Sequence, residues 1–325
     1  MLAGLLDTLE VKGLTLRNRI VMPPMQTGLA TKKGAVTDAL IEYYSRRSRA
    51  IGLLIVEHSY IALEGKLSER QLGIYEDSLI GGLESLSSSI HAMGTPVVIQ
   101  INHAGKKAST EMTGMQPVAP SPVGDARGLK AGDIEGLCEA YAVAAERAMK
   151  AGFDGVEIHG AHGFLLNQFY SPLTNRRNDR YGGSLQKRMR FLLEVVERVR
   201  ERIGGRLLLY RLGSDDLDLT GTQINDSQKF AVELEEAGVD IIDVSGGLCG
   251  GSPEKLQGIQ GYFIPQAQKI KEVVDVPVIG VGGIKDPRYA DTLIGEEKVD
   301  FVAVGRGLLN DSDWAEKAFE RLRSG

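Results

Sequence analysis

The sequence predicts a single (β/α)8 barrel over residues 1–325, with long loops over the C-terminal face of its strands. Three observations predict it: eight short apolar runs of strand length, stretches of helical periodicity between them, and a weak internal repeat. In the repeat, which occurs in KAGFDGVEIHG, EAGVDIIDVSGG and EKVDFVAVGRG, an Asp precedes the apolar run and a Gly follows it. A barrel of this type commonly forms one domain at this length.

The predicted strands are almost continuously apolar, which is typical of parallel strands buried on both faces. They lie at 20–22, 53–56, 97–101, 156–158, 207–212, 241–244, 278–281 and 301–304. The clearest predicted helices lie at 134–151, 185–203, 226–237, 265–274 and 313–323. A doubly wound dinucleotide-binding domain would need fewer strands and a GxGxxG turn after the first one, and this sequence has no such turn.

The composition excludes several classes of partner. The chain has 38 Lys and Arg against 43 Asp and Glu, a net charge of −5, and no basic block that would indicate nucleic acid or an anionic membrane. Its two cysteines are too few for a cysteine-built metal site or a disulfide framework. The charged segment Met1–Asn18 does not resemble a signal peptide, and no apolar run approaches the ~20 residues of a membrane span. We expect a cytoplasmic protein with a small-molecule partner.

Three loops after predicted strands are conspicuous. The loop 102–133 is long and rich in Gly and Pro, 171–184 carries three arginines, and 246–261 contains six glycines around Cys249. In such barrels the reacting groups lie at the C-terminal ends of the strands and in the loops that follow. Because long loops without a function are uncommon, we expect 102–133 to cover the catalytic face.

Glycines after the last two predicted strands favour a phosphate site. The pair Gly282 and Gly283 follows the seventh strand, and Gly305 and Arg306 follow the eighth and lead into a short helix. Glycines let backbone N–H groups approach an anion, a helix N-terminus adds partial positive charge, and Arg306 supplies a charge-assisted bond. Ordinary tight turns would produce the same pattern.

Two polar residues lie within predicted strands. Arg211 lies in the run LLLYRLG, and burying an unpaired Arg costs several kcal/mol, so we expect it to meet either Asp215 or Asp216 or an anionic ligand. Gln100 ends the third strand in VVIQINH, where its amide offers a donor and an acceptor to a planar heterocycle. A polar core residue would look the same.

The fourth predicted strand runs into EIHGAHG, which places His159 and His162, two of only five histidines, at the mouth of the barrel. Two imidazoles can donate hydrogen bonds to one carbonyl oxygen or oxyanion, and each good donor is worth ~3 to 4 kcal/mol in a transition state. Core packing and a metal pair are the alternatives. A metal is disfavoured because a zincin needs H-E-x-x-H on a helix and no third ligand is evident, so we predict no metal.

These residues lie in motifs that resemble the old yellow enzyme family of FMN-dependent barrels. The motifs are LRNRIVMPPMQTGL, GLLIVEHS, IQINHAGKKA, VEIHGAHGFLLNQFYSPLTNRRNDRYGGS, YRL and VAVGRGLLND. They occur in the family's order through most of the chain, and two of them, at MQTGL and SPLTNRRNDRYGGSLQKRMRF, are most similar to the branch of bacterial 2,4-dienoyl-CoA reductases and NADH:flavin oxidoreductases. The resemblance implies bound FMN, with NADH or NADPH as the electron donor, and suggests a homo-oligomer.

The resemblance also implies a role for each matching residue. Those implied to lie along the flavin ring are Pro23, Pro24, Met25, Gln26 and His58. Gln100 would hold the pyrimidine edge of the ring. Arg211 would lie near the N1 and C2-carbonyl side, where its charge favours the anionic reduced flavin. Those implied to bind the FMN phosphate are Gly282, Gly283, Gly305 and Arg306. His159 and His162 match the pair that holds the carbonyl oxygen of the substrate.

The sequence departs from the family at two positions. Many members have, at the position of Phe164, a Tyr that protonates the substrate α-carbon, and Phe has no hydroxyl. Either another donor, such as Cys249, Tyr60, Tyr262 or a water, replaces it, or the reaction differs. At Gln26 relatives have Cys, Thr or His, so we expect a shifted flavin potential. No cysteine cluster follows the barrel, so electrons are expected directly from NAD(P)H or from another donor.

The expected function is therefore FMN-dependent ene-reduction, in which hydride reaches the β-carbon of an alkene conjugated to a carbonyl that His159 and His162 polarise. A flavin dehydrogenase working in the oxidative direction, or on an amine or a CoA thioester, is an alternative. Another is a flavin-binding redox or electron-transfer protein that no longer turns over. A flavin-free isomerase or aldolase would leave Gln100 and the histidine pair without a shared explanation. The sequence does not identify the substrate.

Overall fold

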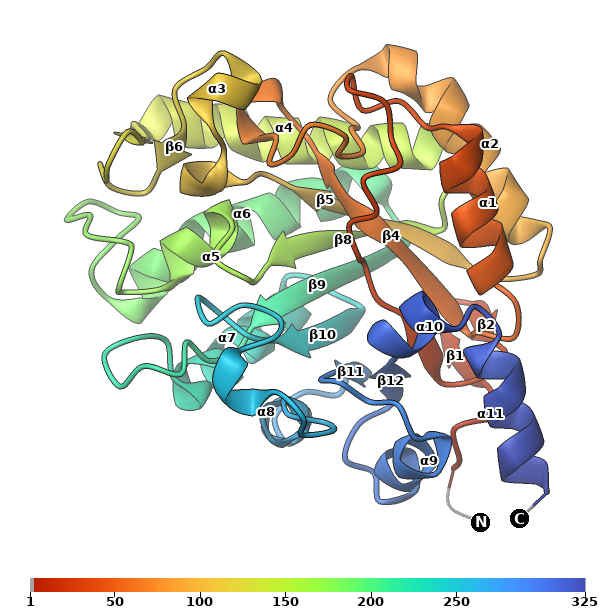
Figure 1. Ribbon diagram of the computed structural model, residues 1–325. Helices are drawn as coiled ribbons and strands as arrows, with labels where there is room; N and C mark the ends of the chain where they lie inside the picture. The colour runs from red at the N-terminus through yellow and green to blue at the C-terminus, as the bar shows by residue number, and fades with distance from the viewer. Residues whose placement is uncertain (1–2, 325) are drawn as a thin grey trace.

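The computed structural model describes residues 3–324, and its centre is a closed barrel of eight parallel strands wrapped by helices (Figure 1). The strands are joined in the order β10-β11-β12-β3-β4-β5-β8-β9. Their bounds are β3 Ile20–Met22, β4 Leu53–Tyr60, β5 Val97–Asn102, β8 Gly155–Gly160, β9 Leu207–Gly213, β10 Ile241–Ser245, β11 Val278–Gly280 and β12 Phe301–Ala303. This confirms the predicted (β/α)8 barrel. The single domain predicted over 1–325 includes three end residues that lie outside the described part, and it stays a prediction.

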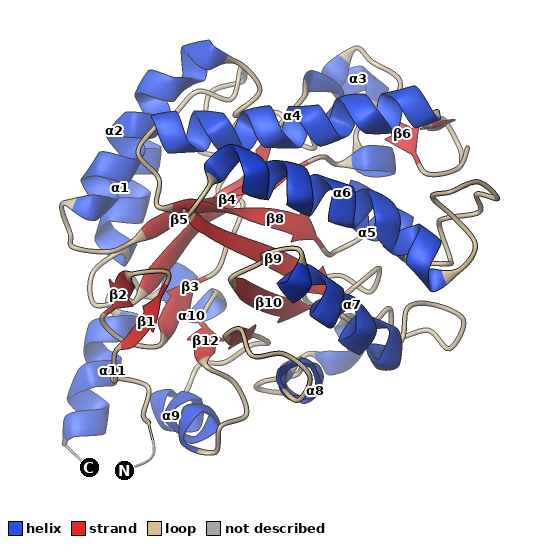
Figure 2. Ribbon diagram, turned by 180° about the vertical axis from the view of Figure 1, so that it is seen from behind, coloured by secondary structure: helices blue, strands red, loops and turns tan. Residues whose placement is uncertain are grey.

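The helices form a ring around the strands (Figure 2). The longer ones are α1 Asp38–Arg47, α2 Ile80–His91, α4 Ala131–Lys150, α6 Leu185–Ile203, α7 Ile224–Glu236, α8 Ile264–Lys271, α9 Pro287–Gly295 and α11 Trp314–Arg323. Shorter helices in the loops are α3 Thr110–Thr113, α5 Leu165–Tyr170 and α10 Arg306–Asn310, with single turns at Leu63–Gly65, Asp77–Leu79, Gly105–Lys107 and Glu254–Leu256. All five helices expected from periodicity are present. No helix within 3–324 is both long enough and apolar enough to cross a membrane.

An antiparallel hairpin covers the N-terminal end of the barrel (Figure 2). Its strands are β1 Leu9–Val11 and β2 Leu14–Leu16. Val11 and Leu16 are buried in one apolar cluster with side chains from the barrel strands. Because these side chains are buried against the barrel interior, the hairpin closes the N-terminal end of the barrel to water. A ligand site is therefore expected at the C-terminal end.

The interior of the barrel changes from apolar to polar along the strands. Val98, Leu209 and Ile241 are fully buried in the same interior cluster as the hairpin. Because alternate residues of a strand face the same side, the next interior positions on β5, β9 and β10 belong to residues two places further on. These are polar: Gln100, Arg211 and Asp243, all buried. The polar layer lies towards the C-terminal ends of the strands, where barrels of this class have their sites.

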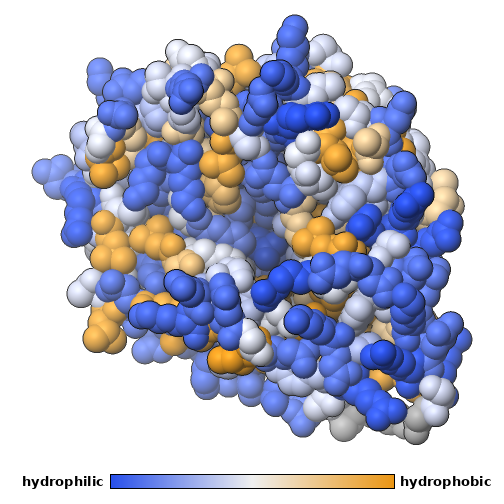
Figure 3. Space-filling view, in the orientation of Figure 1, coloured by the Kyte–Doolittle hydropathy of each residue, from blue (hydrophilic) through white to orange (hydrophobic). Residues whose placement is uncertain are grey.

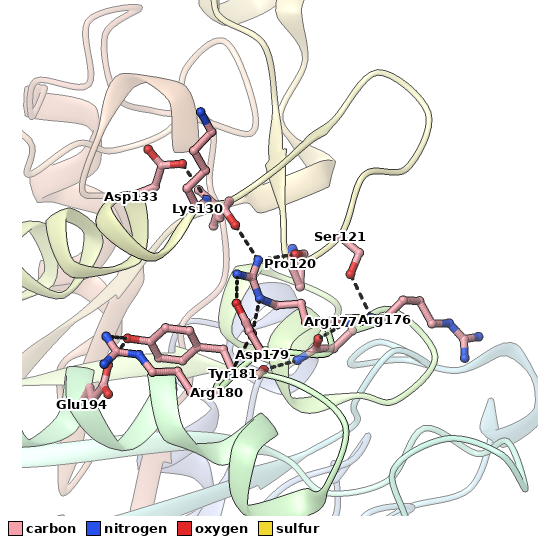
Figure 4. A network of polar contacts seen from close by, with 12 residues as sticks. Pro120, Ser121, Lys130, Asp133, Arg176, Arg177, Asp179, Arg180, Tyr181 and Glu194 are labelled. Carbon is pink, nitrogen blue, oxygen red and sulfur yellow. Dashed lines mark hydrogen bonds and ion pairs between the residues drawn. The ribbon is translucent and has the colours of Figure 1, made fainter.

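Two long loops over that end are joined by hydrogen bonds from two adjacent arginines (Figure 4). The Arg177 guanidinium, in the loop after β8, donates to the Pro120 carbonyl of the loop after β5 at 2.7 Å. The Arg176 N–H donates to Ser121 Oγ at 2.9 Å, while the Arg176 side chain points away from the network. Within the loop after β5, β6 Val118–Ala119 pairs with β7 Arg127–Gly128. The two loops therefore form one connected rim.

Candidate active site

The candidate site is the mouth of the barrel at the C-terminal ends of its strands. In the orientation of Figure 1, the space-filling view shows this face hollowed near its centre, with hydrophilic residues in the hollow (Figure 3). Predicted site residues from β3, β4, β5, the β8 loop, β9, β11 and β12 all follow or end strands of the same closed barrel. The fold therefore brings residues far apart in the sequence to one end of the molecule.

Four buried side chains form the polar layer below the mouth. Gln100 Nε2 donates to Glu157 Oε1 at 2.7 Å, and Arg211 Nη1 lies 3.3 Å from Asp243 Oδ2. Burial, and then the negative charge of Asp243, raise the pKa of Glu157 well above its ordinary value, and burial raises the pKa of Asp243. The layer thus places two carboxyl groups with raised pKa values beside one permanently charged guanidinium.

The carboxylate partner predicted for Arg211 was wrong. Asp243 stands directly opposite Arg211 in the register of β9 and β10. Asp216 instead accepts from Ser171 Oγ at 2.6 Å, and Asp215 accepts from the Leu217 N–H at 2.7 Å. Both lie beyond the end of β9, where their carboxylates fold back onto loop donors rather than into the barrel.

Several polar atoms in this region have no hydrogen-bond partner among residues 3–324. They include Arg211 Nε, Asn102 Oδ1 and His159 Nδ1, each with its surface buried. A buried polar atom without a partner costs about 1 to 3 kcal/mol, so such atoms are rare unless something else satisfies them. Their mixture of donors and acceptors fits a planar heterocycle that carries both N–H and carbonyl groups.

The histidine pair lies at the end of β8 and in its loop. The rings of His159 and His162 are 5.1 Å apart in an edge-to-face arrangement, and the Phe164 ring lies 4.9 Å from that of His159. His162 has φ +57°, a left-handed conformation that non-glycine residues adopt rarely and often at functional sites, and its Nε2 lies 2.7 Å from Ser245 Oγ. Burial lowers the pKa of both imidazoles, so at pH 7 each is neutral and carries one N–H donor.

The structure places His58 beside this pair. Its ring lies 6.2 Å from that of His159 and 5.3 Å from that of Phe164. The Gln71 amide Nε2 lies 2.8 Å from His58 Nδ1, so Nδ1 accepts and the ring proton is on Nε2. Burial, aided by the charges of Arg211 and Lys107, lowers the pKa of His58 to about 4.

The first predicted residues after β3 contact the turn that follows β12. Pro23 is buried and Pro24 is half-buried. A Cβ at Gly305 would lie 3.1 Å from Met25 Sδ and 3.4 Å from Pro23 Cγ, so this segment contacts the turn after β12. The structure therefore joins the predicted flavin segment to the predicted phosphate segment.

The next residues of the same loop are held by β4 and by the segment that follows it. Gln26 is exposed and its amide donates to Ser68 Oγ. Thr27 gives Glu57 two hydrogen bonds, from its N–H at 2.9 Å and from its hydroxyl at 2.6 Å. Burial raises the pKa of Glu57 to about 7 against the effect of these bonds.

Of the residues predicted for a phosphate site, Gly283 and Arg306 meet at one cleft, and Gly282 and Gly305 are their neighbours in the chain. Gly283 and Arg306 line a cleft of about 230 Å³ together with Gly258, Ile259, Gln260 and Lys285. A Cβ at Gly283 would lie 2.7 Å from Arg306 Nη2, so a larger residue would displace the guanidinium. The cleft thus presents two cations and backbone N–H groups of glycines, which suit a phosphate.

Sequence reasoning missed four residues that the structure brings to the site. Lys285 follows Gly282 and Gly283, and a basic residue beside a phosphate turn is a signal that reasoning could have used. Glu157 and Asp243 lie in apolar strands, which is the same signal that drew attention to Arg211. Lys107 lies in the motif IQINHAGKKA, but nothing in the motif indicates that it reaches the histidine loop from the loop after β5.

Together these features define a class: a (β/α)8 barrel whose mouth suits a phosphate-bearing heterocycle beside two neutral imidazoles, as in FMN-dependent oxidoreductases. Comparison with known proteins identifies the family. The chain belongs to the NADH:flavin oxidoreductase / NADH oxidase family, whose profile matches residues 5–324.

Individual proteins of known type are similar to this chain over most of its length. The chain is 42% identical over 324 residues to the NADH oxidase of Thermoanaerobacter brockii, covering 96% of this chain but only half (50%) of that protein. It is 38% identical over 320 residues to the NADPH dehydrogenase of Geobacillus thermodenitrificans, covering 96% and 92%. The solved old yellow enzyme homologue of Zymomonas mobilis superposes with a TM-score of 0.87 at 29% identity, covering 98% and 93%. The chain is thus an FMN-dependent NAD(P)H oxidoreductase of the old yellow enzyme type.

Proposed function

We propose that the protein is an ene-reductase, which reduces an alkene conjugated to a carbonyl with electrons from NADH or NADPH. The observation that carries the proposal is the pair of neutral imidazoles of His159 and His162, side by side at the mouth of the barrel. Neutral N–H donors bind a carbonyl oxygen and strengthen their bonds as negative charge develops on it. Polarising the carbonyl makes the β-carbon of the conjugated alkene electron-poor, and hydride adds there.

The residues that would hold FMN fit its two ends. The cleft of Gly283, Lys285 and Arg306 would take the phosphate, with Gly282 and Gly305 allowing close backbone approach. Gln100 and Arg211 would face the pyrimidine edge of the ring, with Pro23 to Gln26 and His58 along its sides. When bound, FMN accepts hydride from the nicotinamide and delivers it to the electron-poor carbon of the substrate.

The buried layer below would set the charge at the ring. Arg211 keeps a positive charge at any ordinary pH, and Asp243 fixes its position through the ion pair at 3.3 Å. A positive charge at this edge stabilises the negative charge that a reduced ring carries. The Glu157 carboxyl, by accepting from Gln100, holds the amide in one orientation.

The test is anaerobic rapid mixing of the enzyme, reduced with NADPH or NADH, with 2-cyclohexenone. We expect the enone to reoxidise the wild-type enzyme, and His159→Ala and His162→Ala to slow that step by about 100-fold or more. Reduction by the nicotinamide is measured separately in each variant, so that an effect on the enone step is distinguished from an effect on hydride uptake. Wild-type rates with enone in both variants would contradict the assignment.

Phe164 favours a second candidate: a flavin protein that transfers electrons to a partner or oxidises a substrate without reducing an alkene. The side chain at this position has no proton to give, which alkene reduction needs and electron transfer does not. Reduced enzyme that is reoxidised by a quinone but by no enone, amine-derived imine or enoyl thioester would support this candidate.

We also propose a domain organisation, a substrate class, a location and an oligomeric state. We propose one FMN-binding domain over 1–325, a small alkene conjugated to a carbonyl as substrate, a cytoplasmic location and a homo-oligomer. Both cysteines, Cys138 and Cys249, are free, which fits a reducing compartment.

A further inference from the structure

Alkene reduction needs a proton at the α-carbon, and the residue at the position of the usual donor is Phe164. The Phe164 ring is 7% exposed and packs with Ala104 and Ala108. It lies within 5.3 Å of the ring of His58 and 4.9 Å of that of His159. The ring therefore forms an apolar wall of the site, and the proton has to come from another side chain near it or from water.

The side-chain donors named from the sequence are engaged elsewhere. The Tyr60 hydroxyl donates to the Lys33 carbonyl at 2.9 Å, and the Tyr262 hydroxyl donates to the Gly251 carbonyl at 2.8 Å. The Cys249 thiol lies 3.2 Å from the Asp215 carbonyl, and burial raises its pKa to about 11. Each of these three groups is thus directed at a backbone oxygen.

His58 contacts the ring but is a poor acid. Its Nδ1 already accepts from Gln71, and the low pKa makes the imidazole neutral at pH 7. A neutral imidazole gives up its remaining proton only with great difficulty, so His58 donates a hydrogen bond rather than a proton.

Lys107 is the remaining acid at the ring. Its ammonium lies 5.0 Å from the centroid of Phe164 and donates to the His162 carbonyl at 2.6 Å. The side chain is exposed at the mouth, and a Cβ at Gly163 would lie 3.3 Å from Nζ, so the ammonium rests on the histidine loop itself. An ammonium has three donors, and the His162 carbonyl uses one of them.

We propose that Lys107 is the proton donor of this enzyme, in place of the hydroxyl that Phe164 lacks. The proposal rests on the ene-reductase function. After hydride adds at the β-carbon, the enolate held by the histidines uses its electron pair to form a C–H bond at the α-carbon, and one N–H bond of the Lys107 ammonium breaks. The neutral amine then regains a proton from water, to which the side chain is exposed. The reducing equivalents come from NAD(P)H.

Two electrostatic features suit Lys107 to this step. Partial burial and the neighbouring charge of Lys106 lower the pKa of Lys107, which makes its ammonium a stronger acid. Its charge also lies close enough to lower the pKa of His159 and His162. The same charge stabilises the enolate before the proton moves.

The test separates proton donation from charge. In Lys107→Arg the charge and the reach remain, but a guanidinium does not release a proton near neutral pH. We expect Lys107→Arg and Lys107→Met both to slow reoxidation by 2-cyclohexenone by about 100-fold, the usual contribution of a general acid. Reduction by NADPH and reoxidation by ferricyanide, which need no proton at carbon, should stay within about twofold in both variants. Lys187→Met, which alters an exposed lysine of α6, is the matched control and should behave as wild type.

A rescue experiment completes the test. Adding Phe164→Tyr to Lys107→Met should restore at least about tenfold of the lost rate, because a hydroxyl returns to the site. Wild-type reoxidation by the enone in Lys107→Met or Lys107→Arg would overturn the role of Lys107 and leave the ene-reductase function intact. If no alkene reoxidises the wild-type enzyme, the proposed function itself fails, and the proton donor with it.

Discussion

Two neighbouring layers of side chains inside the barrel come from the same strands and are equally buried, but one layer is apolar and the other is polar and charged. In the lower layer Val98, Leu209 and Ile241 pack against the hairpin and leave no polar atom to satisfy. In the upper layer, two residues further along each strand, Gln100, Arg211 and Asp243 are equally buried. One pleat of each strand thus separates a layer that stabilises the fold from a layer that costs it free energy.

The upper layer has a physical reason to be polar. Burying an ion pair is often no more favourable than burying apolar residues of the same size, and an unpartnered buried donor is unfavourable outright. Arg211 Nε and both carboxylate oxygens of Asp243 lack hydrogen bonds within 3–324. Such a layer is explained by a ligand that supplies the missing partners, so its residues should control ligand binding and the lower layer should control stability.

The largest expected effect is on stability and comes from the lower layer. Leu209→Ala removes a fully buried side chain and should lower the free energy of unfolding by about 2 to 5 kcal/mol. The FMN affinity of the folded fraction should change by less than about threefold, because the polar layer is retained. Urea unfolding and FMN titration of the same preparation check both parts. A decrease of FMN affinity well beyond threefold in the folded fraction would contradict the separate roles of the two layers.

The next effect is on binding and comes from the upper layer. Arg211→Met should weaken FMN binding by about 100-fold, since bonds from charged donors are worth roughly 1.5 to 3 kcal/mol and the ring charge loses its counterpart. The variant should stay folded when Asp243→Asn is combined with it, which avoids leaving an unpaired buried carboxylate. Fluorescence titration of the apoprotein measures the affinity. Unchanged affinity would show that the ring does not lie over this layer.

The smallest effect is a change in pH dependence. Burial raises the pKa of Glu157 above its ordinary value of 4.5, so the native state holds this proton to a higher pH than the unfolded state does. Above that value the free energy of unfolding therefore falls with rising pH, by up to about 1.4 kcal/mol per pH unit for one proton. Glu157→Gln should make the fall above about pH 5 less steep.

The control for this prediction is Glu197→Gln, which alters an exposed carboxylate of α6 and should leave the pH profile unchanged. Urea unfolding at several pH values measures both variants. A Glu157→Gln profile that parallels the wild type would mean that Glu157 is ionised in the native protein.

Much of this organisation could be predicted from the sequence. Apolar runs and helical periodicity predict the eight strands of the barrel. A residue that directly follows a strand is predicted to lie at the C-terminal end of the barrel. That reasoning brought His159, Arg211 and Arg306 to one face. The structure places each of them there.

What could not be predicted depends on register and loop path. Asp243 pairs with Arg211 because β9 and β10 align these two residues, and no local pattern encodes an alignment between strands about 30 residues apart. Lys107 reaches the His162 carbonyl through an irregular loop. Gln71 reaches His58 from a segment without regular structure. These partners become evident only from the folded chain.

The central claim is that the polar layer and the glycine cleft together hold FMN for reduction by a nicotinamide. The most direct measurement is an absorption spectrum of the purified protein, before and after equimolar FMN, followed by anaerobic titration with NADH and then NADPH. We predict a yellow protein that binds FMN tightly and is bleached by at least one nicotinamide. A colourless protein that takes up no FMN would contradict the account.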